Sequence, residues 1–357
     1  MNGRVGRVER NETCGLTLSR QGPIWREPGA ASVMSIARRT LLTGGLAIMG
    51  SGYPLAQASR IPRVGFLTPA TSDRTIPISA FRTALAELGY VEGQSIALEF
   101  RLAAGDISRL PGLAAELVAL PADVIVVDGG IAVPAVMAAT KTIPVVMATA
   151  GDPVALGYVQ SLSRPGGNIT GFSLISGELN QKRLDLLRAA FPKAENVAVL
   201  FNPQNPTAQA GLAFVKEAGE RLGIRVALVE LSSPEAILGL RSEALRPDAP
   251  VLVVPDAMFW NSRQAIITRL EGSGLSALYP EREYADDGGL MAYGPNVPDN
   301  FRRAAGYVDR ILKGASPGTL PIQQPSRFDF VINMRTARRL GVALPQSMLS
   351  SADEIID

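Results

Sequence analysis

Short apolar runs alternate with amphipathic segments along most of the chain, and this alternation predicts an α/β fold. Runs rich in β-branched residues suit buried strands, and segments with apolar residues every three to four positions suit covering helices. In the first part of the chain the predicted strands are Arg63–Leu67, Ile96–Arg101, Val124–Val127 and Pro144–Thr149, and the predicted helices are Ile78–Leu88, Leu110–Ala119 and about Val133–Lys141. This βαβ repetition predicts a parallel sheet with helices on both faces.

The same pattern begins again after the turn-rich segment Pro165–Asn168. Here the predicted strands are Val197–Phe201, Arg225–Glu230, Val251–Val254, Ala277–Tyr279 and Leu290–Tyr293, and the predicted helices are Leu179–Ala190, Thr207–Leu222, Pro234–Leu245 and Ser262–Gly272. We therefore predict two doubly wound parallel-sheet, Rossmann-like lobes with a boundary near Gly171.

The pattern of the C-terminal part of the chain predicts that the chain crosses from one lobe to the other again. A helix at Pro298–Lys313 is followed by an extended crossing at Pro317–Pro325, a strand at Phe328–Ile332 and a helix at Met334–Leu340. Such a path joins the lobes by several hinge strands and builds a cleft that can close. We predict that lobe 1 comprises 61–171 plus about 294–320, and lobe 2 comprises 172–293 plus about 321–357.

The N-terminal region has the pattern of an export signal. Arg38 and Arg39 precede the short apolar run Leu41–Met49, and a small-residue cleavage site precedes Ser59. The run is shorter than the roughly 20 residues of a spanning helix. We assign residues 1–58 to an upstream extension plus signal peptide, with Met34 favoured as the start. Export by Sec, or by Tat because of the arginine pair, predicts a periplasmic protein, not lipid-anchored because the cleavage site lacks cysteine.

Composition narrows the chemistry. Hydrophobic residues make up 46% of the chain and charged residues 19%, as in a well-packed globular protein. The net charge of +2, without a long basic run, indicates no nucleic-acid partner. The chain has no histidine, and its one cysteine, Cys14, precedes the predicted cleavage site. We therefore predict no catalytic residues and no metal site, and no cofactor because glycine-rich nucleotide motifs are absent.

Ligands of open parallel sheets bind beyond the carboxyl ends of the strands. The loops to search are Thr68–Ser79, Asp128–Ile131, Ala148–Pro153, Phe172–Ser176, Asn202–Thr207 and Asp256–Asn261. The candidate ligand-binding residues are Thr68, Thr71, Ser72, Gly129, Gly130, Ala148, Asp152, Ser173, Asn202, Asp256, Phe259 and Trp260. Hydroxyl and backbone N–H groups of the first lobe suit a carboxylate at helix N-termini. Plain N-capping is the structural alternative.

Asp256 is the sharpest candidate, because it follows an apolar strand and stands beside two aromatic residues. It suits a ligand ammonium group while Phe259 or Trp260 stacks on an apolar group. The alternative is that Asp256 caps the next helix and the aromatic residues close the core. Asp152, before a proline, is more typical of a hinge or turn, and Arg183 looks like part of a solvated helix face.

Several motifs resemble those of a bacterial family of ABC-transporter substrate-binding proteins. They are Gly151–Val154, Ser163–Gly171, Tyr284–Gly294, Ala304–Gly314 and Val331–Ala337, spread over about Ile61–Asp357. The resemblance implies a type I periplasmic-binding-protein fold, whose lobes close on a small ligand and deliver it to a membrane permease and its ATPase. Characterised relatives include tryptophan-binding-like members.

For the members that bind aromatic amino acids, the resemblance suggests first-lobe groups on the carboxylate and a second-lobe acid on the amine. These roles would fall on Thr68, Ser72, Gly130 and Asp256. One departure is the loop Asp128–Ala132, which lacks the Ser or Thr that relatives often have there. This departure argues against amino-acid binding in particular.

We therefore predict a monomeric solute-binding protein of an ABC uptake transporter and not an enzyme. The ligand is left open between an aromatic or branched amino acid, another small carboxylate and an aromatic-acid-type nutrient. One alternative is a ligand-sensing protein that reports to a signalling receptor. A carboxylate-based enzyme is the other, and it would need Asp256 to meet Asp152 or Glu178 in the cleft.

Overall fold

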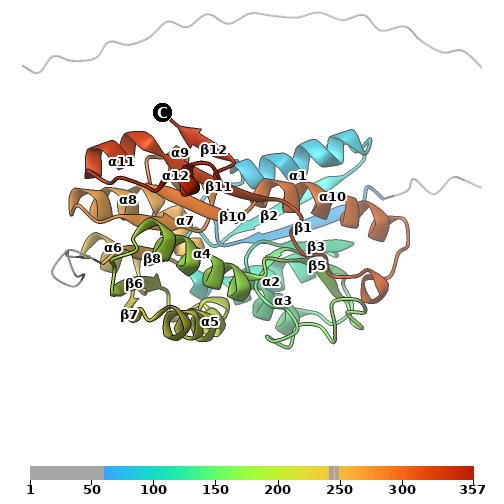
Figure 1. Cartoon of the computed structure of the whole chain (residues 1–357). Coiled ribbons are helices and arrows are strands. Elements are labelled where there is room, and N and C mark those ends of the chain that lie inside the picture. The colour runs from blue at the N-terminus through green and yellow to red at the C-terminus, as the bar shows by residue number, and fades with distance from the viewer. Residues whose placement is uncertain (1–59, 241–244, 246–248) are drawn as a thin grey trace, which may run out of the picture. The chain divides into compact units, whose positions relative to one another are not determined.

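The computed structural model describes residues 60–240, 245 and 249–357. The predicted signal peptide and the start at Met34 lie outside these residues. The described chain belongs to one unit, Ala58–Asp357, and forms two sheets with interleaved helices (Figure 1). The predicted α/β fold with two lobes is confirmed. None of the described helices combines the length and the hydropathy that a membrane crossing requires.

The first sheet has five strands in the spatial order β2-β1-β3-β4-β5. They are β1 (Arg63–Thr68), β2 (Ala97–Leu102), β3 (Val124–Val127), β4 (Val145–Ala150) and β5 (Ile169–Ser173). All neighbouring pairs are parallel. Every residue of β3 and β4 is buried, because helices cover both faces of a parallel sheet.

The second sheet has seven strands in the order β12-β11-β10-β9-β8-β6-β7. They are β6 (Asn196–Phe201), β7 (Arg225–Glu230), β8 (Val251–Val253), β9 (Ala277–Tyr279), β10 (Met291–Pro295), β11 (Phe328–Asn333) and β12 (Glu354–Ile356). Only the β10–β11 pair is antiparallel among these strands. The reversal places the returning chain at the side of an otherwise parallel sheet.

Helices cover both faces of each sheet through four apolar clusters. The first sheet carries α1 (Ile76–Glu87) and α10 (Val297–Leu312) on one face, and α2 (Leu110–Ala119) and α3 (Val133–Ala139) on the other. The second carries α4 (Ser176–Ala190), α5 (Pro206–Leu222), α11 (Met334–Leu340) and α12 (Gln346–Leu349) on one face, and α6 (Pro234–Leu238), α7 (Ala257–Asn261), α8 (Arg263–Gly272) and α9 (Arg282–Asp286) on the other.

The chain passes between the two sheets at three places. It leaves β5 for α4, leaves β10 for α10, and returns through 320–328 to β11. Two crossings are hydrogen-bonded to each other: the Ser173 N–H donates to the Gln323 carbonyl at 2.9 Å, and the Gln323 N–H donates to the Gly171 carbonyl at 2.9 Å. The predicted extended crossing begins instead with the short 3₁₀ turn η4 (Pro317–Thr319). The predicted residue boundaries of the lobes stay predictions.

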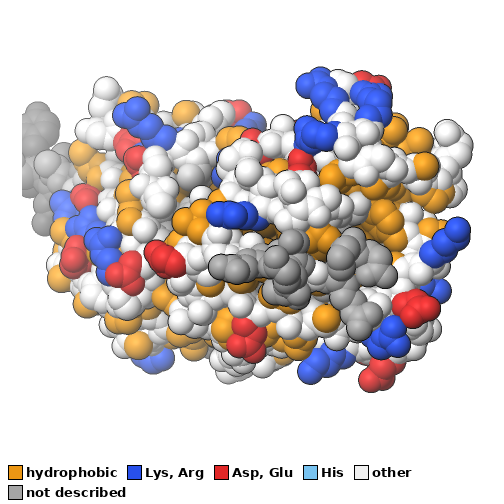
Figure 2. Space-filling view, turned by 90° about the vertical axis from the view of Figure 1, so that its left-hand side faces the viewer, with side chains coloured by type: hydrophobic (Ala, Val, Ile, Leu, Met, Phe, Trp, Pro, Cys, Tyr) orange, Lys and Arg blue, Asp and Glu red, His pale blue; other side chains and the backbone are white. Residues whose placement is uncertain are grey.

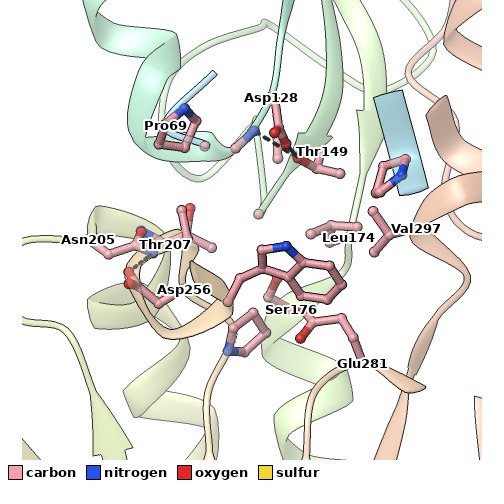
Figure 3. A pocket seen from close by; sticks show the side chains of 18 of the residues that line it. Pro69, Asp128, Thr149, Leu174, Ser176, Asn205, Thr207, Asp256, Glu281 and Val297 are labelled. Atoms are coloured by element: carbon pink, nitrogen blue, oxygen red, sulfur yellow. Dashed lines mark hydrogen bonds between the residues drawn. The ribbon is translucent and has the colours of Figure 1, made fainter. Parts of the chain in front are cut away.

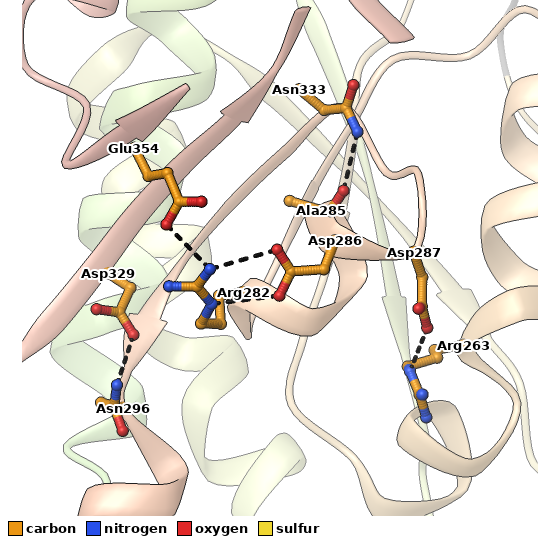
Figure 4. Close-up of polar contacts among 9 residues, drawn as sticks. All are labelled: Arg263, Arg282, Ala285, Asp286, Asp287, Asn296, Asp329, Asn333 and Glu354. Carbon is orange, nitrogen blue, oxygen red and sulfur yellow. Dashed lines mark hydrogen bonds and ion pairs between the residues drawn. The ribbon is translucent and has the colours of Figure 1, made fainter. Parts of the chain in front are cut away.

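Polar contacts fix the elements around β10 and β11 (Figure 4). Arg282 at the start of α9 forms ion pairs with Asp286 and with Glu354 of β12. Asn333 Nδ2 donates to the Ala285 carbonyl at 2.9 Å. On the face shown in Figure 2, basic and acidic side chains are interspersed, as on the surface of an ordinary soluble domain.

Candidate functional site between the lobes

One pocket receives the carboxyl ends of strands from both sheets. Loops after β1, β3 and β4 line it from the first lobe, and loops after β6, β8 and β9 line it from the second (Figure 3). Its volume is about 120 Å³. This is the position in which open parallel sheets bind ligands.

Thr207, on the first turn of α5, brings the second lobe against two glycines of the first. A Cβ atom at Gly130 would lie 2.6 Å from Thr207 Oγ1, and one at Gly151 would collide with Thr207 Cγ2. The two lobes approach this closely only because both positions lack a side chain. A second contact between the lobes is the hydrogen bond from Asn261 Nδ2 to the Pro69 carbonyl, at 3.4 Å.

The Thr207 hydroxyl is held at the pocket without a partner of its own. Asn205 caps α5, because its Oδ1 accepts hydrogen bonds from the backbone N–H groups of Thr207 and Ala208 at 3.0 and 3.4 Å. Thr207 Oγ1 is buried and has no hydrogen-bond partner among the described residues. A buried hydroxyl without a partner is costly, so a bound molecule is a natural source of one.

Asp256 lines the pocket, but four protein groups already occupy its carboxylate. Its Oδ1 accepts from the backbone N–H groups of Met258 and Phe259 at 2.8 and 3.3 Å. Its Oδ2 accepts from Nδ2 of Asn202 and of Asn205 at 3.1 and 2.9 Å. Burial raises the pKa of Asp256, and these hydrogen bonds oppose the rise. Since a carboxylate has about four acceptor sites, the helix cap that the sequence left as an alternative is formed.

Asp128, directly after β3, keeps part of its acceptor capacity. Thr68 Oγ1 donates to its Oδ2 at 2.8 Å, and Thr149 Oγ1 donates to its Oδ1 at 3.2 Å. Thr149 Oγ1 also accepts from the Gly129 N–H at 2.8 Å, which fixes the glycine loop. Burial raises the pKa of Asp128, and the two hydroxyl groups oppose the rise. About two of its acceptor sites are left for a ligand.

Apolar side chains form another wall of the pocket. Leu174 and Val297 lie there (Figure 3), and Trp260 contributes its indole ring. The Trp260 ring packs edge-on to Tyr284 at 6.2 Å between centroids, and the Arg263 guanidinium lies 5.0 Å from its centroid. Such an aromatic wall suits an apolar ligand group.

Glu281 is the third carboxyl group of the pocket, and it lies near a buried arginine. Burial raises the pKa of Glu281 to about 8, although Arg183 opposes the rise. The prediction that Arg183 is solvated is wrong: the side chain is fully buried. Its guanidinium donates to Asn180 Oδ1 at 2.7 Å and to the Tyr293 and Pro280 carbonyls at 2.7 and 3.2 Å. Arg183 therefore fixes the segment that precedes Glu281.

The ionisable side chains that line the pocket from the described residues are all carboxyl groups. Asp128, Asp256 and Glu281 line it, and among the described residues no Lys or Arg does. Within the described part of the chain, no three His, Cys, Asp or Glu residues are grouped so as to hold a metal ion. The pocket therefore suits a ligand that carries a positive charge or several hydrogen-bond donors.

Four of the candidate residues chosen from sequence line this pocket: Gly129, Gly130, Asp256 and Trp260. Three others lie behind it and hold groups that line it. Thr68 donates to Asp128, Asn202 donates to Asp256, and Ser173 Oγ donates to the Gly151 carbonyl at 2.7 Å. Their roles toward a ligand stay predictions.

The remaining five candidates lie away from the lining. Ala148 and Phe259 are buried in apolar clusters. Asp152 is exposed and accepts from the backbone N–H groups of Val154 and Ala155 at 3.0 Å. Thr71 is exposed, and the Ser72 hydroxyl accepts from the Arg74 N–H. In the structure Asp152 and Ser72 thus form local turns.

The pocket also brings together four residues that were not among the candidates predicted from sequence, namely Asp128, Ser176, Thr207 and Glu281. Asp128, Ser176 and Thr207 fall within the loops that were to be searched. The signal for Asp128 was its place directly after a buried apolar strand, which it shares with Asp256. Glu281 follows the strand Ala277–Tyr279, which was predicted with these bounds, but the loop after that strand was not among the loops chosen.

Comparison with known proteins identifies the family. Residues 73–356 match the family described as ABC transporter substrate binding protein. The chain belongs to this family. The family consists of solute-binding proteins that work with ABC transporter components, and the match covers both lobes of the pocket.

Individual relatives agree with the assignment to this family of substrate-binding proteins. The chain is 26% identical over 262 residues to a tyrosine-binding protein of Clostridioides difficile (strain R20291), which covers 73% of this chain and 75% of that protein. A conserved domain protein from Vibrio cholerae has a TM-score of 0.77 at 23% identity, covering 83% of this chain and 100% of that one. An ABC domain from Streptococcus pneumoniae in complex with L-Trp has a TM-score of 0.76 at 24% identity, covering 83% and 99%. These two structures share the fold.

Proposed function

We propose that this substrate-binding protein is an exported, monomeric receptor that binds an amino acid between its lobes and delivers it to a membrane permease. The family assignment supports a ligand-binding role, and the pocket between two lobes supplies a place for the ligand. A ligand that contacts both lobes favours the closed arrangement over the open one. The permease would then recognise the closed form.

The observation that carries the choice of ligand is the unequal use of the two aspartates. Asp256 is saturated by four donors, whereas Asp128 accepts two hydrogen bonds and lines the same pocket. Asp128 is therefore the group that can receive a ligand ammonium. Hydrogen bonds between a carboxylate and a charged donor are stronger than those between neutral groups, so we assign the amine to Asp128.

The other functional groups of an amino acid find matching partners. Thr207 Oγ1 is buried and unpartnered among the described residues, and it can donate to a ligand carboxylate beside Gly130 and Gly151. Leu174, Val297 and Trp260 suit an apolar side chain. Thus Thr207 supplies the hydroxyl that the Asp128–Ala132 loop lacks.

The relatives support the same class of ligand. One is named a tyrosine-binding protein, and one solved structure holds L-Trp. The N-terminal segment described above supports export to the periplasm by Sec or Tat, and an extracytoplasmic location is usual for the family.

The test is thermal unfolding and calorimetric titration of the purified protein with matched ligands. L-Tyrosine, L-tryptophan and L-leucine are compared with tyramine, which lacks the carboxylate, and with 3-(4-hydroxyphenyl)propionate, which lacks the amine. A ligand at about 100 times its Kd should add roughly 2.7 kcal/mol to stability. We expect binding of amino acids and at least about 30-fold weaker binding of the compound without an amine, because a buried charge loses its partner. Equal binding of that compound would contradict the assignment.

A further inference from the structure

The side of the pocket opposite Asp128 carries polar groups that an amino-acid head group does not use. In Figure 3, Ser176 and Glu281 lie on the far side of the pocket from Asp128 and Thr149. Leu174, Val297 and Trp260 line the same pocket with apolar atoms. A ligand whose amine meets Asp128 would direct its side chain toward this region.

Ser176 presents a hydroxyl without a partner. It is 4% exposed, lines the pocket, and its Oγ has no hydrogen-bond partner within the described part of the chain. The backbone before it is constrained, because Ile175 has φ 43° and ψ 43°, a left-handed conformation that is costly for a β-branched residue. The Ile175 N–H donates to Ser173 Oγ at 3.1 Å, which helps to hold this turn.

Glu281 presents a partly buried carboxyl group to the same pocket. Its side chain makes no capping hydrogen bond to α9, and it has no hydrogen bond to any other described side chain or backbone group. The segment around it is fixed, because Arg183 holds the Pro280 carbonyl and Arg282 is paired with Asp286 and Glu354 (Figure 4). These contacts fix the chain on both sides of Glu281, whose side chain lines the pocket.

We propose that Ser176 and Glu281 form a subsite that selects aromatic amino acids with an N–H or O–H donor on the ring over apolar amino acids of the same shape. The inference rests on the proposed function and adds to it the residues that contact the ligand's side chain and discriminate between side chains. A phenol or an indole N–H can donate to the Glu281 carboxyl group or to Ser176 Oγ. A purely apolar ring would leave both groups buried without partners.

The raised pKa of Glu281 also favours an uncharged hydrogen-bond donor on the ligand's side chain. Burial raises the pKa of Glu281 to about 8, with Glu283 and Asp256 adding to the rise and Arg183 and Arg263 opposing it. The raised pKa favours the protonated form of Glu281, which can both accept and donate a hydrogen bond. A phenol hydroxyl, which does both, matches it; an alkyl group does not.

The first experiment needs no variant. Calorimetric titration compares L-tyrosine with L-4-methylphenylalanine, in which a methyl group replaces the hydroxyl at nearly the same size. We expect tyrosine to bind at least about tenfold more tightly, the effect of one buried polar group left unpaired. Equal affinity for the two would overturn the subsite while leaving the proposed function standing. Failure of tyrosine, tryptophan and 4-methylphenylalanine to bind while L-leucine binds would overturn the subsite alone, and failure of L-leucine as well would overturn the proposed ligand class.

Variants then assign the preference to residues. Glu281→Leu removes the hydrogen-bonding group at similar size, and we expect the preference for tyrosine to fall to within about threefold while 4-methylphenylalanine binds as tightly as before or better. Glu281→Gln, which still accepts, should retain most of the preference. Ser176→Ala should lower it partly.

The matched control is Glu178→Gln, an exposed carboxyl group two residues from Ser176 that lies outside the lining and does not act on the pKa of Glu281. It should leave the ratio of the two affinities unchanged. Circular dichroism confirms that each variant is folded, and the wild-type ratio remains the deciding result if Glu281→Leu does not fold. An unchanged ratio in folded Glu281→Leu and Ser176→Ala would overturn the assignment to these residues.

Discussion

Asp128 and Asp256 occupy equivalent places in the two lobes but have different surroundings. Each follows a buried apolar strand, β3 or β8, and each of these strands is third from one edge of its sheet. Asp256 accepts four hydrogen bonds from its own lobe, and Asp128 accepts two. Two aspartates at the same topological point thus differ in role. Asp256 stabilises the loops of its own lobe, whereas Asp128 has acceptor sites left for a ligand.

The largest expected effect is the loss of ligand binding in Asp128→Asn. The variant cannot offer a charge to the ammonium, so the affinity for the bound amino acid should fall at least about 30-fold. The unfolding free energy of the ligand-free protein should stay the same or rise slightly, because a partly buried charge has been removed. Calorimetric titration and denaturant unfolding measure the two quantities. An affinity within about threefold of wild type would contradict the assignment of the ligand contact to Asp128 rather than Asp256.

The corresponding change in the second lobe, Asp256→Ala, should lower the unfolding free energy of the protein. It removes the cap of α7 and leaves the amides of Asn202 and Asn205 without their acceptor, so we expect a loss of about 2 kcal/mol in unfolding free energy. Asp152→Ala is the matched control, because Asp152 makes a similar turn while exposed, and it should cost much less. Denaturant unfolding distinguishes them. Equal losses would mean that the Asp256 network contributes nothing beyond a local turn.

The fold was largely predictable because its strands and long helices repeat strongly. The apolar runs Val124–Val127 and Val251–Val254 marked the two central strands, and β3 has the predicted bounds. The helices α7 and α9 were missed, since five residues are too few to show a helical period. Part of the predicted helix Pro234–Leu245 lies outside the described residues; α6 spans Pro234–Leu238.

The site was only partly predictable, because its chemistry depends on contacts between distant strands. Both aspartates stood in the loops to be searched, but the number of donors around each comes from other elements, such as Thr149 for Asp128 and Asn202 for Asp256. The burial of Arg183 was also hidden, since its carbonyl partners belong to Pro280 and Tyr293, far along the chain. Among polar neighbours on a helix, Arg183 had no local sign of burial.

A third prediction concerns the contact that brings the two aspartates to one pocket. In Gly151→Ala the new methyl group meets Thr207, so the lobes cannot close fully and the affinity should fall about tenfold. Adding Thr207→Ser removes Cγ2, keeps the hydroxyl and should restore part of the affinity. Gly112→Ala is the control, because a Cβ there meets nothing within 4 Å. No recovery in the double variant would show that the two residues are not coupled in closure.

The smallest expected effect is on the pH dependence of stability. Burial raises the pKa of Asp128, so the folded protein holds a proton at pH values where the unfolded chain, with a pKa of about 3.9, has lost it. The unfolding free energy of the ligand-free protein should therefore fall as pH rises from about 4 through the folded-state pKa, and level off above it. In Asp128→Asn this fall should be shallower, by less than about 1.4 kcal/mol per pH unit, the limit for one proton. Denaturant unfolding at a series of pH values measures the difference. Parallel profiles for wild type and variant would show that folding does not raise the pKa of Asp128, since Asp256, whose pKa is raised for the same reason, is unchanged in both.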